Sequence, residues 1–131
     1  MKSLLFRLDI DPPRTTAQEK GVTVIRGIPR FYEKQEVKQA RYYLESALAP
    51  WKPKRPLEGA LSVNMVWDYP HKGRHKDKEP KTTKPDIDNM VKLMLDCMTG
   101  TFWQDDRQIV KLTIEKRWNE KGAIGVLIQE I

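Results

Sequence analysis

The segment from residue 61 to residue 68 constrains the fold more than any other part of this sequence, because apolar and polar side chains alternate along it. Its apolar set is Leu61, Val63, Met65 and Trp67. Alternation is typical of a strand with one buried face, since successive strand side chains point to opposite sides. The chain must therefore build a sheet, and other segments must cover the apolar face of this strand.

Two segments predict helices that could form this cover. Residues 86–98 carry an apolar stripe at helical spacing, with Gly100 as a C-terminal stop. Residues 31–49 have a similar stripe, which Pro50 ends. Three tyrosines of this second segment are predicted to pack within the helix or at a dimer interface: Tyr32, Tyr42 and Tyr43.

Further strands are predicted at 2–9, 22–25, 108–118 and 123–131, and the strand at 22–25 could be one arm of a hairpin. Residues 14–20 are polar and predict a loop. The order of elements predicts an α+β fold in which two main helices pack on a mixed β-sheet. A chain of 131 residues without internal repeats fits a single domain, residues 1–131.

The charge of the chain favours a polyanionic partner. Lys and Arg number 24 against 18 Asp and Glu, a net charge of +6. The segment 71–84 concentrates this charge and has almost no apolar content, so it predicts a mobile loop. It is either a solvated charge run or a DNA-binding loop that contacts phosphates. Its cations, the predicted DNA contacts, are Lys72, Arg74, Lys76, Lys78, Lys81 and Lys84.

Several classes of protein are excluded or disfavoured. The single cysteine, Cys97, allows neither an intrachain disulfide nor a cysteine-based zinc site. No apolar run is long enough to span a membrane, and the N-terminal residues do not resemble a signal peptide, so a cytoplasmic location is expected. His71 and His75 are four residues apart, but this spacing indicates a metal site only on a helix.

The first helical turn at residue 86 carries two carboxylates, Asp86 and Asp88, on either side of Ile87. Aspartate is a favoured N-cap, which accounts for one of them but not for both. Lys92 and Asp96 follow at four-residue steps and share a stripe with Asp88. This stripe is either a solvent-exposed ladder of ion pairs or a line of charges that point into a common site.

A second acidic pair, Asp105 and Asp106, follows the same helix and precedes a strand. Such a pair can mark a solvated turn, but a short connection can also bring it back towards Asp88. Spacing alone does not select between the two acids. Clusters of carboxylate oxygens suit Mg²⁺, which activates water for phosphodiester cleavage. Lys92 could add to the stabilisation of negative charge at such a site.

The set Asp86-Ile-Asp-Asn89, Lys92, Asp96, Phe102-Trp103 and Asp105-Asp106 resembles the RusA family of Holliday-junction resolvases, over about residues 84–117. Members are small, homodimeric, often prophage-encoded endonucleases. The resemblance implies that Asp86, Asp88 and Asp106 bind Mg²⁺, or Mn²⁺ in its place. It implies that Lys92 assists catalysis and that Asn89, Asp96 and Asp105 support the site.

The resemblance also implies a function: paired, metal-dependent cleavage of four-way DNA junctions in recombination and repair. The turn before Asp105 is one residue shorter than in one well-known member of the family, and the loop 71–84 is unusually long and basic. Two alternatives therefore stand beside it, a junction-binding protein without catalysis and a nuclease that cuts flaps or forks. Phe102 and Trp103 could stack on a base, but core packing is the expected role.

Overall fold

The computed structural model describes residues 2–15 and 20–131, so the predicted loop at 14–20 lies partly outside the described residues. The described chain begins with three strands and ends with two, and its helical segments flank the single strand between them. In order they are β1 (Ser3–Leu8), β2 (Lys20–Ile25), β3 (Ile28–Glu33), α1 (Gln35–Leu48), η1 (Ala49–Trp51), β4 (Leu61–Pro70), α2 (Ile87–Met98), η2 (Asp106–Gln108), β5 (Ile109–Asn119) and β6 (Ala123–Glu130).

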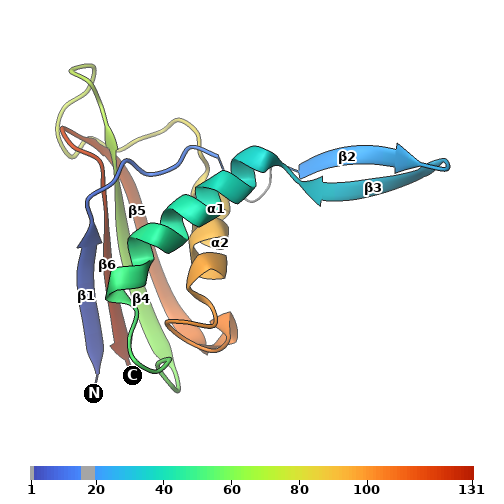
Figure 1. The fold of residues 1–131 in the computed structure, drawn as a ribbon. Helices are drawn as coiled ribbons and strands as arrows, with labels where there is room; N and C mark the ends of the chain where they lie inside the picture. The colour runs from blue at the N-terminus through green and yellow to red at the C-terminus, as the bar shows by residue number, and fades with distance from the viewer. Residues whose placement is uncertain (1, 16–19) are drawn as a thin grey trace.

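Four strands form the main sheet in the order β1-β6-β4-β5 (Figure 1). β4 is antiparallel to β6 and parallel to β5, while β1 is antiparallel to β6. The sheet is therefore mixed. Parallel strands need a long crossover, which here contains α2 and the loop before it. Both helices lie over one face of the sheet (Figure 1), and the predicted α+β class is confirmed.

The alternating segment at 61–68 is the buried centre of this sheet. Every second residue of β4 is at most 1% exposed, and the register sets Val63 beside Ile128 and Trp67 beside Ile124. Cross-strand neighbours share a face, so these side chains form one apolar surface under the helices. Full burial of such a side chain contributes roughly 1.5–3 kcal/mol.

Helix α2 covers this surface with the apolar side chains that the sequence predicts to lie on one side of the helix. Met90, Met94 and Met98 are each at most 1% exposed, and Cys97 is also buried. Phe102 and Trp103, which follow the helix, lie in the same core, as expected from their apolar character. The main chain of α2 begins at Ile87, with Asp86 as its N-cap residue.

Helix α1 begins later than predicted. The predicted helix at 31–49 is wrong at its N-terminal end, because residues 31–33 belong to β3 and the helix starts at Gln35. β2 and β3 instead form a two-stranded hairpin that extends away from the body of the molecule (Figure 1). Its turn consists of Arg26 and Gly27, both at positive φ, 51° and 76°. Paired positive φ values match the right-handed twist of a hairpin.

The predicted packing role of two tyrosines within α1 is also wrong. Tyr42 is 74% exposed and Tyr43 is 42% exposed, because the buried face of the helix consists of Val37, Ala40, Leu44 and Leu48. The side chain of Tyr32 lies outside the described residues. In the part of the chain that the structure covers, no helix combines the length and the apolar character that crossing a membrane requires.

The basic loop 71–84, which the sequence predicts to be mobile, is hydrogen-bonded to the sheet. Its main chain runs along the end of β5: Lys78 N–H donates to the Trp118 carbonyl at 2.8 Å, and Trp118 N–H donates to the Glu79 carbonyl at 2.8 Å. Lys81 N–H donates to the Lys116 carbonyl at 3.3 Å. The loop is therefore joined to the end of β5 by an isolated antiparallel bridge between Pro80 and Arg117.

Candidate active site

An open pocket of about 540 Å³ lies between α2 and β5 and contains most of the predicted catalytic charges. Asp88, Lys92 and Asp96 face it from α2, and Asp106 faces it from the start of η2. Its remaining lining is apolar: Ile87, Val91, Leu95, Leu112 and Ile114. The structure therefore brings together acids that are 18 residues apart in the sequence, Asp88 and Asp106.

The start of α2 presents both of its carboxylates to solvent. Asp86 has extended backbone angles, φ −72° and ψ 145°, and its side chain makes no capping hydrogen bond. Capping therefore does not account for Asp86. Asp88 lies in the first turn, where the partial positive charge of the helix N-terminus stabilises a carboxylate.

Asp105 and Asp106 have different surroundings although they are adjacent. Asp105 caps η2: its carboxylate accepts from Arg107 N–H at 3.0 Å, and its own N–H donates to Gln108 Oε1 at 3.0 Å. Gln108 in turn donates to the Leu57 carbonyl at 3.0 Å, which fixes the turn to the segment before β4. Asp106 is exposed and lines the pocket. Only one acid of the pair thus faces the pocket.

Lys92 stands in the pocket between carboxylates that do not neutralise it. Among the described residues, the ion pairs closer than 4.0 Å involve neither Lys92 nor the acids at 88, 96 and 106. The ladder of ion pairs that the i, i+4 spacing permits is therefore not formed. The charges stay available to a ligand, which is the arrangement that a catalytic or binding site requires.

Three residues of the predicted carboxylate site lie outside the pocket lining. Asn89 and Asp105 are half-buried and Asp86 is exposed, and none of them contributes to the pocket wall. Within the described residues, no three His, Cys, Asp or Glu side chains are already arranged to hold a metal ion. Mg²⁺ is usually bound by one or two carboxylates together with water and substrate phosphate. Asp88 and Asp106 match that requirement in ligand type and share one pocket.

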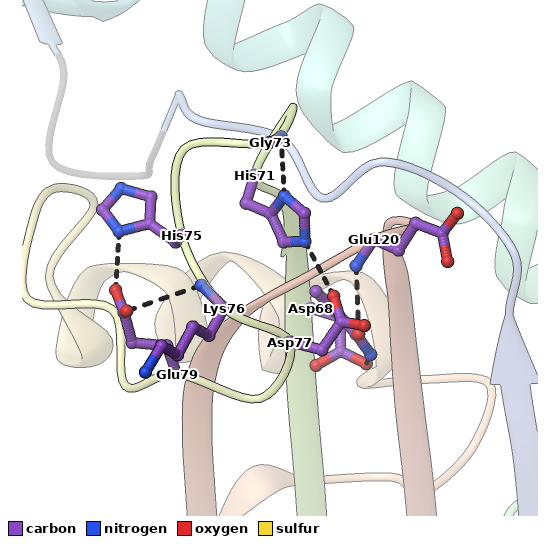
Figure 2. Close-up of polar contacts among 9 residues, drawn as sticks. Asp68, His71, Gly73, His75, Lys76, Asp77, Glu79 and Glu120 are labelled. Carbon is purple, nitrogen blue, oxygen red and sulfur yellow. Dashed lines mark hydrogen bonds and ion pairs between the residues drawn. The ribbon is translucent and has the colours of Figure 1, made fainter.

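The loop 71–84 holds its own histidines and acids together (Figure 2). Gly73 N–H donates to His71 Nδ1 at 2.8 Å, so the proton of the neutral ring lies on Nε2, which is 2.7 Å from Asp77 Oδ1. His75 Nδ1 is 2.6 Å from Glu79 Oε2, and its ring stacks on Trp118. Both histidines thus have carboxylate partners that order the loop.

The cations of this loop are not equivalent. Lys72, Arg74, Lys76, Lys78 and Lys84 are exposed and can reach a phosphate. Lys81 is only 3% exposed, with its Nζ 4.3 Å from the centre of the Trp118 ring and 5.1 Å from that of Tyr69. Burial lowers the pKa of Lys81, and the charges of Arg14 and Lys116 lower it further. Lys81 is therefore turned away from solvent, unlike the other cations of the loop, and its DNA contact stays a prediction.

A second, larger pocket of about 770 Å³ lies at the N-terminal end of β6, around Asp9, Asp11 and Asp68. It does not compete as the carboxylate site, because Asp68 is 8% exposed and already paired. Arg117 Nε donates to it at 2.6 Å and Asn119 Nδ2 at 3.2 Å. The hydrogen bond to Asp68 raises the pKa of Arg117. This group stabilises the end of the sheet.

Sequence reasoning overlooked one residue beside the site. Lys116 lies on β5 and donates to the carbonyls of Thr83 and Pro85 at 2.6 and 2.7 Å. In sequence it is one of two lysines in an alternating strand. Its position opposite Trp67 on the helix-covered face depends on the parallel pairing of β4 and β5, which the sequence does not reveal.

Carboxylate oxygens that can bind a hard cation, a neighbouring lysine and an adjacent basic loop define the nuclease class of enzymes. Comparison with protein families agrees with this class. The family described as Endodeoxyribonuclease RusA matches residues 11–129. The chain belongs to this family, as the carboxylate motif predicts, and the family implies dependence on a divalent metal ion.

Two relatives extend the similarity beyond the motif. The chain is 33% identical to the crossover junction endodeoxyribonuclease rusA of Lactococcus phage r1t, over 96% of this chain and 97% of that protein. It is 28% identical to the uncharacterized protein YqaN of Bacillus subtilis (strain 168), over 72% of this chain and 74% of that protein. The first similarity therefore includes the hairpin and the basic loop as well as the pocket.

Proposed function

We propose that this protein is a Mg²⁺-dependent endodeoxyribonuclease that resolves Holliday junctions by paired cleavage of phosphodiester bonds. The observation that supports this most directly is the convergence of Asp88, Lys92 and Asp106 on one pocket beside an exposed basic loop. Membership of the RusA family and the similarity to a phage crossover junction endodeoxyribonuclease support the substrate.

Asp88 and Asp106 are the proposed metal ligands of the pocket, with Asp86 as a third ligand from the residue before the helix. The bound Mg²⁺, for which Mn²⁺ can substitute, would activate water and neutralise charge on the phosphate. The ammonium of Lys92 would stabilise the negative charge that develops on the phosphate oxygens. Asp96 and Asn89 would support the ligands from the same helix, and Asp105 would support Asp106 by fixing η2.

The exposed cations of the loop, namely Lys72, Arg74, Lys76, Lys78 and Lys84, are the proposed DNA contacts. The loop leads directly into Asp86, so a backbone held by the loop would lie next to the metal ligands. Phosphate contacts supply affinity without sequence preference. This fits a substrate that is recognised by its branched shape.

A homodimer is the proposed active form. A four-way junction has two-fold symmetry, and two copies of a single site would cut two strands symmetrically. A sedimentation mass of one subunit, measured at concentrations at which junctions are cut in pairs, would contradict this part of the proposal.

The decisive variant is Asp88→Asn, which removes a carboxylate ligand with little change of shape. We expect it to lower the rate of junction cleavage by at least about 100-fold, because loss of a metal ligand affects binding and charge together. Affinity for the junction, measured by gel shift in EDTA, should stay near that of the unmodified protein. Glu58→Gln, whose carboxylate is exposed and lies outside both the pocket and the basic loop, serves as the control.

The same gels separate the alternatives. A panel of four-way junctions, flaps and forks, with and without Mg²⁺, identifies the preferred substrate. Binding without any metal-dependent product from the unmodified protein would favour a non-catalytic junction binder. Cleavage by Asp88→Asn at the original rate would remove Asp88 from the site.

A further inference from the structure

Two lysines from different parts of the chain meet on the three carbonyl groups that precede Asp86. Lys116 Nζ donates to the Thr83 and Pro85 carbonyls at 2.6 and 2.7 Å. Lys81 Nζ donates to the Lys84 carbonyl at 2.7 Å and to Thr83 Oγ1 at 2.5 Å. The carbonyls of residues 83, 84 and 85 thus each accept a hydrogen bond from an ammonium group. Such charge-assisted bonds are stronger than those between neutral groups.

Both lysines are themselves held in place. Lys116 lies on β5 opposite Trp67 of β4, on the sheet face that the helices cover. Lys81 is almost fully buried, and its ammonium lies over the rings of Trp118 and Tyr69. The segment 83–85 is therefore attached to β5 through Lys116 and to the buried loop residue Lys81, whose ammonium lies over aromatic rings of β4 and β5.

The segment leads into Asp86, the last residue with extended backbone angles before α2, whose side chain makes no capping hydrogen bond. The Asp86 carbonyl accepts from Met90 N–H at 3.1 Å, so the helix holds the residue on its C-terminal side. On its N-terminal side, the main chain of Asp86 continues from the carbonyls that the two lysines bind. The position of Asp86 relative to Asp88 thus depends on the main chain at 83–85 as well as on the first turn of the helix.

We propose that Lys116 and Lys81 form a clamp that positions Asp86 for metal binding. Lys116 and Lys81 are positioning residues in this role, since they act through the main chain and do not contact substrate. The inference rests on the proposed function, because it is the metal site that requires Asp86 in a fixed place. A clamp that serves stability alone would affect the whole fold instead of this one ligand.

Lys116→Met is the main test, because methionine keeps the apolar stem of the side chain and removes its three donors. Lys116→Arg keeps the positive charge and the donors, and Lys121→Met is a matched control on the β5–β6 turn. The first measurement is amide hydrogen exchange of the metal-free protein, resolved to peptides that cover residues 82–90. The second is Mn²⁺ affinity by calorimetry, without DNA.

We expect Lys116→Met to exchange faster in this segment only and to bind Mn²⁺ on the order of tenfold more weakly, the usual effect of losing a group that orients a ligand. Lys116→Arg should recover most of the affinity, and Lys121→Met should match the unmodified protein. Lys81→Met should repeat the result for Lys116→Met, with an additional loss of stability because its ammonium also lies over two aromatic rings.

Unchanged exchange at 82–90 together with unchanged Mn²⁺ affinity would overturn the clamp. So would faster exchange over the whole chain, which would indicate a purely structural role, or weaker junction binding at unchanged Mn²⁺ affinity, which would indicate a DNA contact. Failure of the unmodified protein to cut any branched DNA would contradict the proposed function instead. The exchange and calorimetric results do not depend on cleavage.

Discussion

Tyr69 is the residue whose chemistry most clearly depends on its surroundings. Its side chain is fully buried at the end of β4, and its hydroxyl has no hydrogen-bond partner among the described residues. Burial raises the pKa of Tyr69 well above its ordinary value of 10.0, because the phenolate cannot be solvated there. Arg14 lowers the pKa by a smaller amount.

The sign of the resulting pH dependence follows from this raised pKa. Below pH 10 the tyrosine is protonated in both the folded and the unfolded chain, so its contribution to stability is constant. Above pH 10 the unfolded chain loses the proton and the folded chain keeps it. The folded state then binds more protons, and stability falls as pH rises.

Tyr69→Phe should remove this alkaline loss. At pH 7 the variant should be as stable as the unmodified protein, or more stable by up to about 1 kcal/mol, because a buried hydroxyl without a partner carries a desolvation cost. Urea unfolding at pH 7 and at pH values above 10 measures both effects. Equal pH dependence in the two proteins would show that Tyr69 does not titrate on unfolding.

At this scale the sequence predicts the identity of the charges better than their roles. The residues at 88, 92, 96 and 106 reach one pocket, as their pattern suggests. Spacing cannot show which of two adjacent acids faces the pocket. In the structure Asp105 and Gln108 form the cap of η2, which leaves Asp106 to line the pocket. A lysine in a polar segment gives no sign that two aromatic rings cover it, so the sequence does not distinguish Lys81 from the exposed cations of the loop.

Among the elements, the β2–β3 hairpin depends least on the rest of the fold. All described side chains from Val22 to Arg30 are exposed, including Val24 at 65% and Ile28 at 54%. A lone two-stranded hairpin is marginally stable in water. The sequence predicts one of its strands but continues the helix into the other, because residues 31–33 happen to extend the helical spacing of α1.

Replacement of residues 22–31 by a short glycine–serine turn should therefore leave the body intact. Gly21 pairs with Tyr32, so the two cut ends are already neighbours. We expect the free energy of unfolding to change by less than about 1 kcal/mol, since the packing of the core is left almost unchanged. Arg26→Ala, which keeps the hairpin, is the matched control in urea unfolding. A decrease of several kcal/mol, or unfolding that is no longer cooperative, would mean that the hairpin packs on the body.

For the whole molecule, the crossover between β4 and β5 connects the basic loop to the pocket. The basic loop and α2 both belong to this one connection, so the chain passes from the exposed cations to the proposed metal ligands within a few residues. The sequence predicts the α+β class and the mixed sheet. It does not predict that β4 and β5 are parallel neighbours, because pairing between distant strands depends on the folded core and not on local pattern.

This arrangement predicts that basic side chains contribute to DNA affinity only at the end of β4 that carries the loop. β4 separates the loop from a second basic segment, 52–55, by ten residues of strand, or roughly 33 Å. If the loop binds phosphates, Lys72→Gln, Arg74→Gln and Lys76→Gln together should reduce the slope of log affinity against log salt concentration. The reduction should be about 0.9 for each phosphate that the variant no longer neutralises, and weaker binding should follow at low salt.

The matched control is Lys52→Gln, Lys54→Gln and Arg55→Gln, which removes the same charge at the other end of β4. Gel shifts on a four-way junction in EDTA, over a series of salt concentrations, give both slopes. The control should keep the slope of the unmodified protein. Equal decreases of the slope in the two variants would show that DNA affinity depends on the net charge of the protein. A defined binding surface would instead respond only to the charges that lie on it.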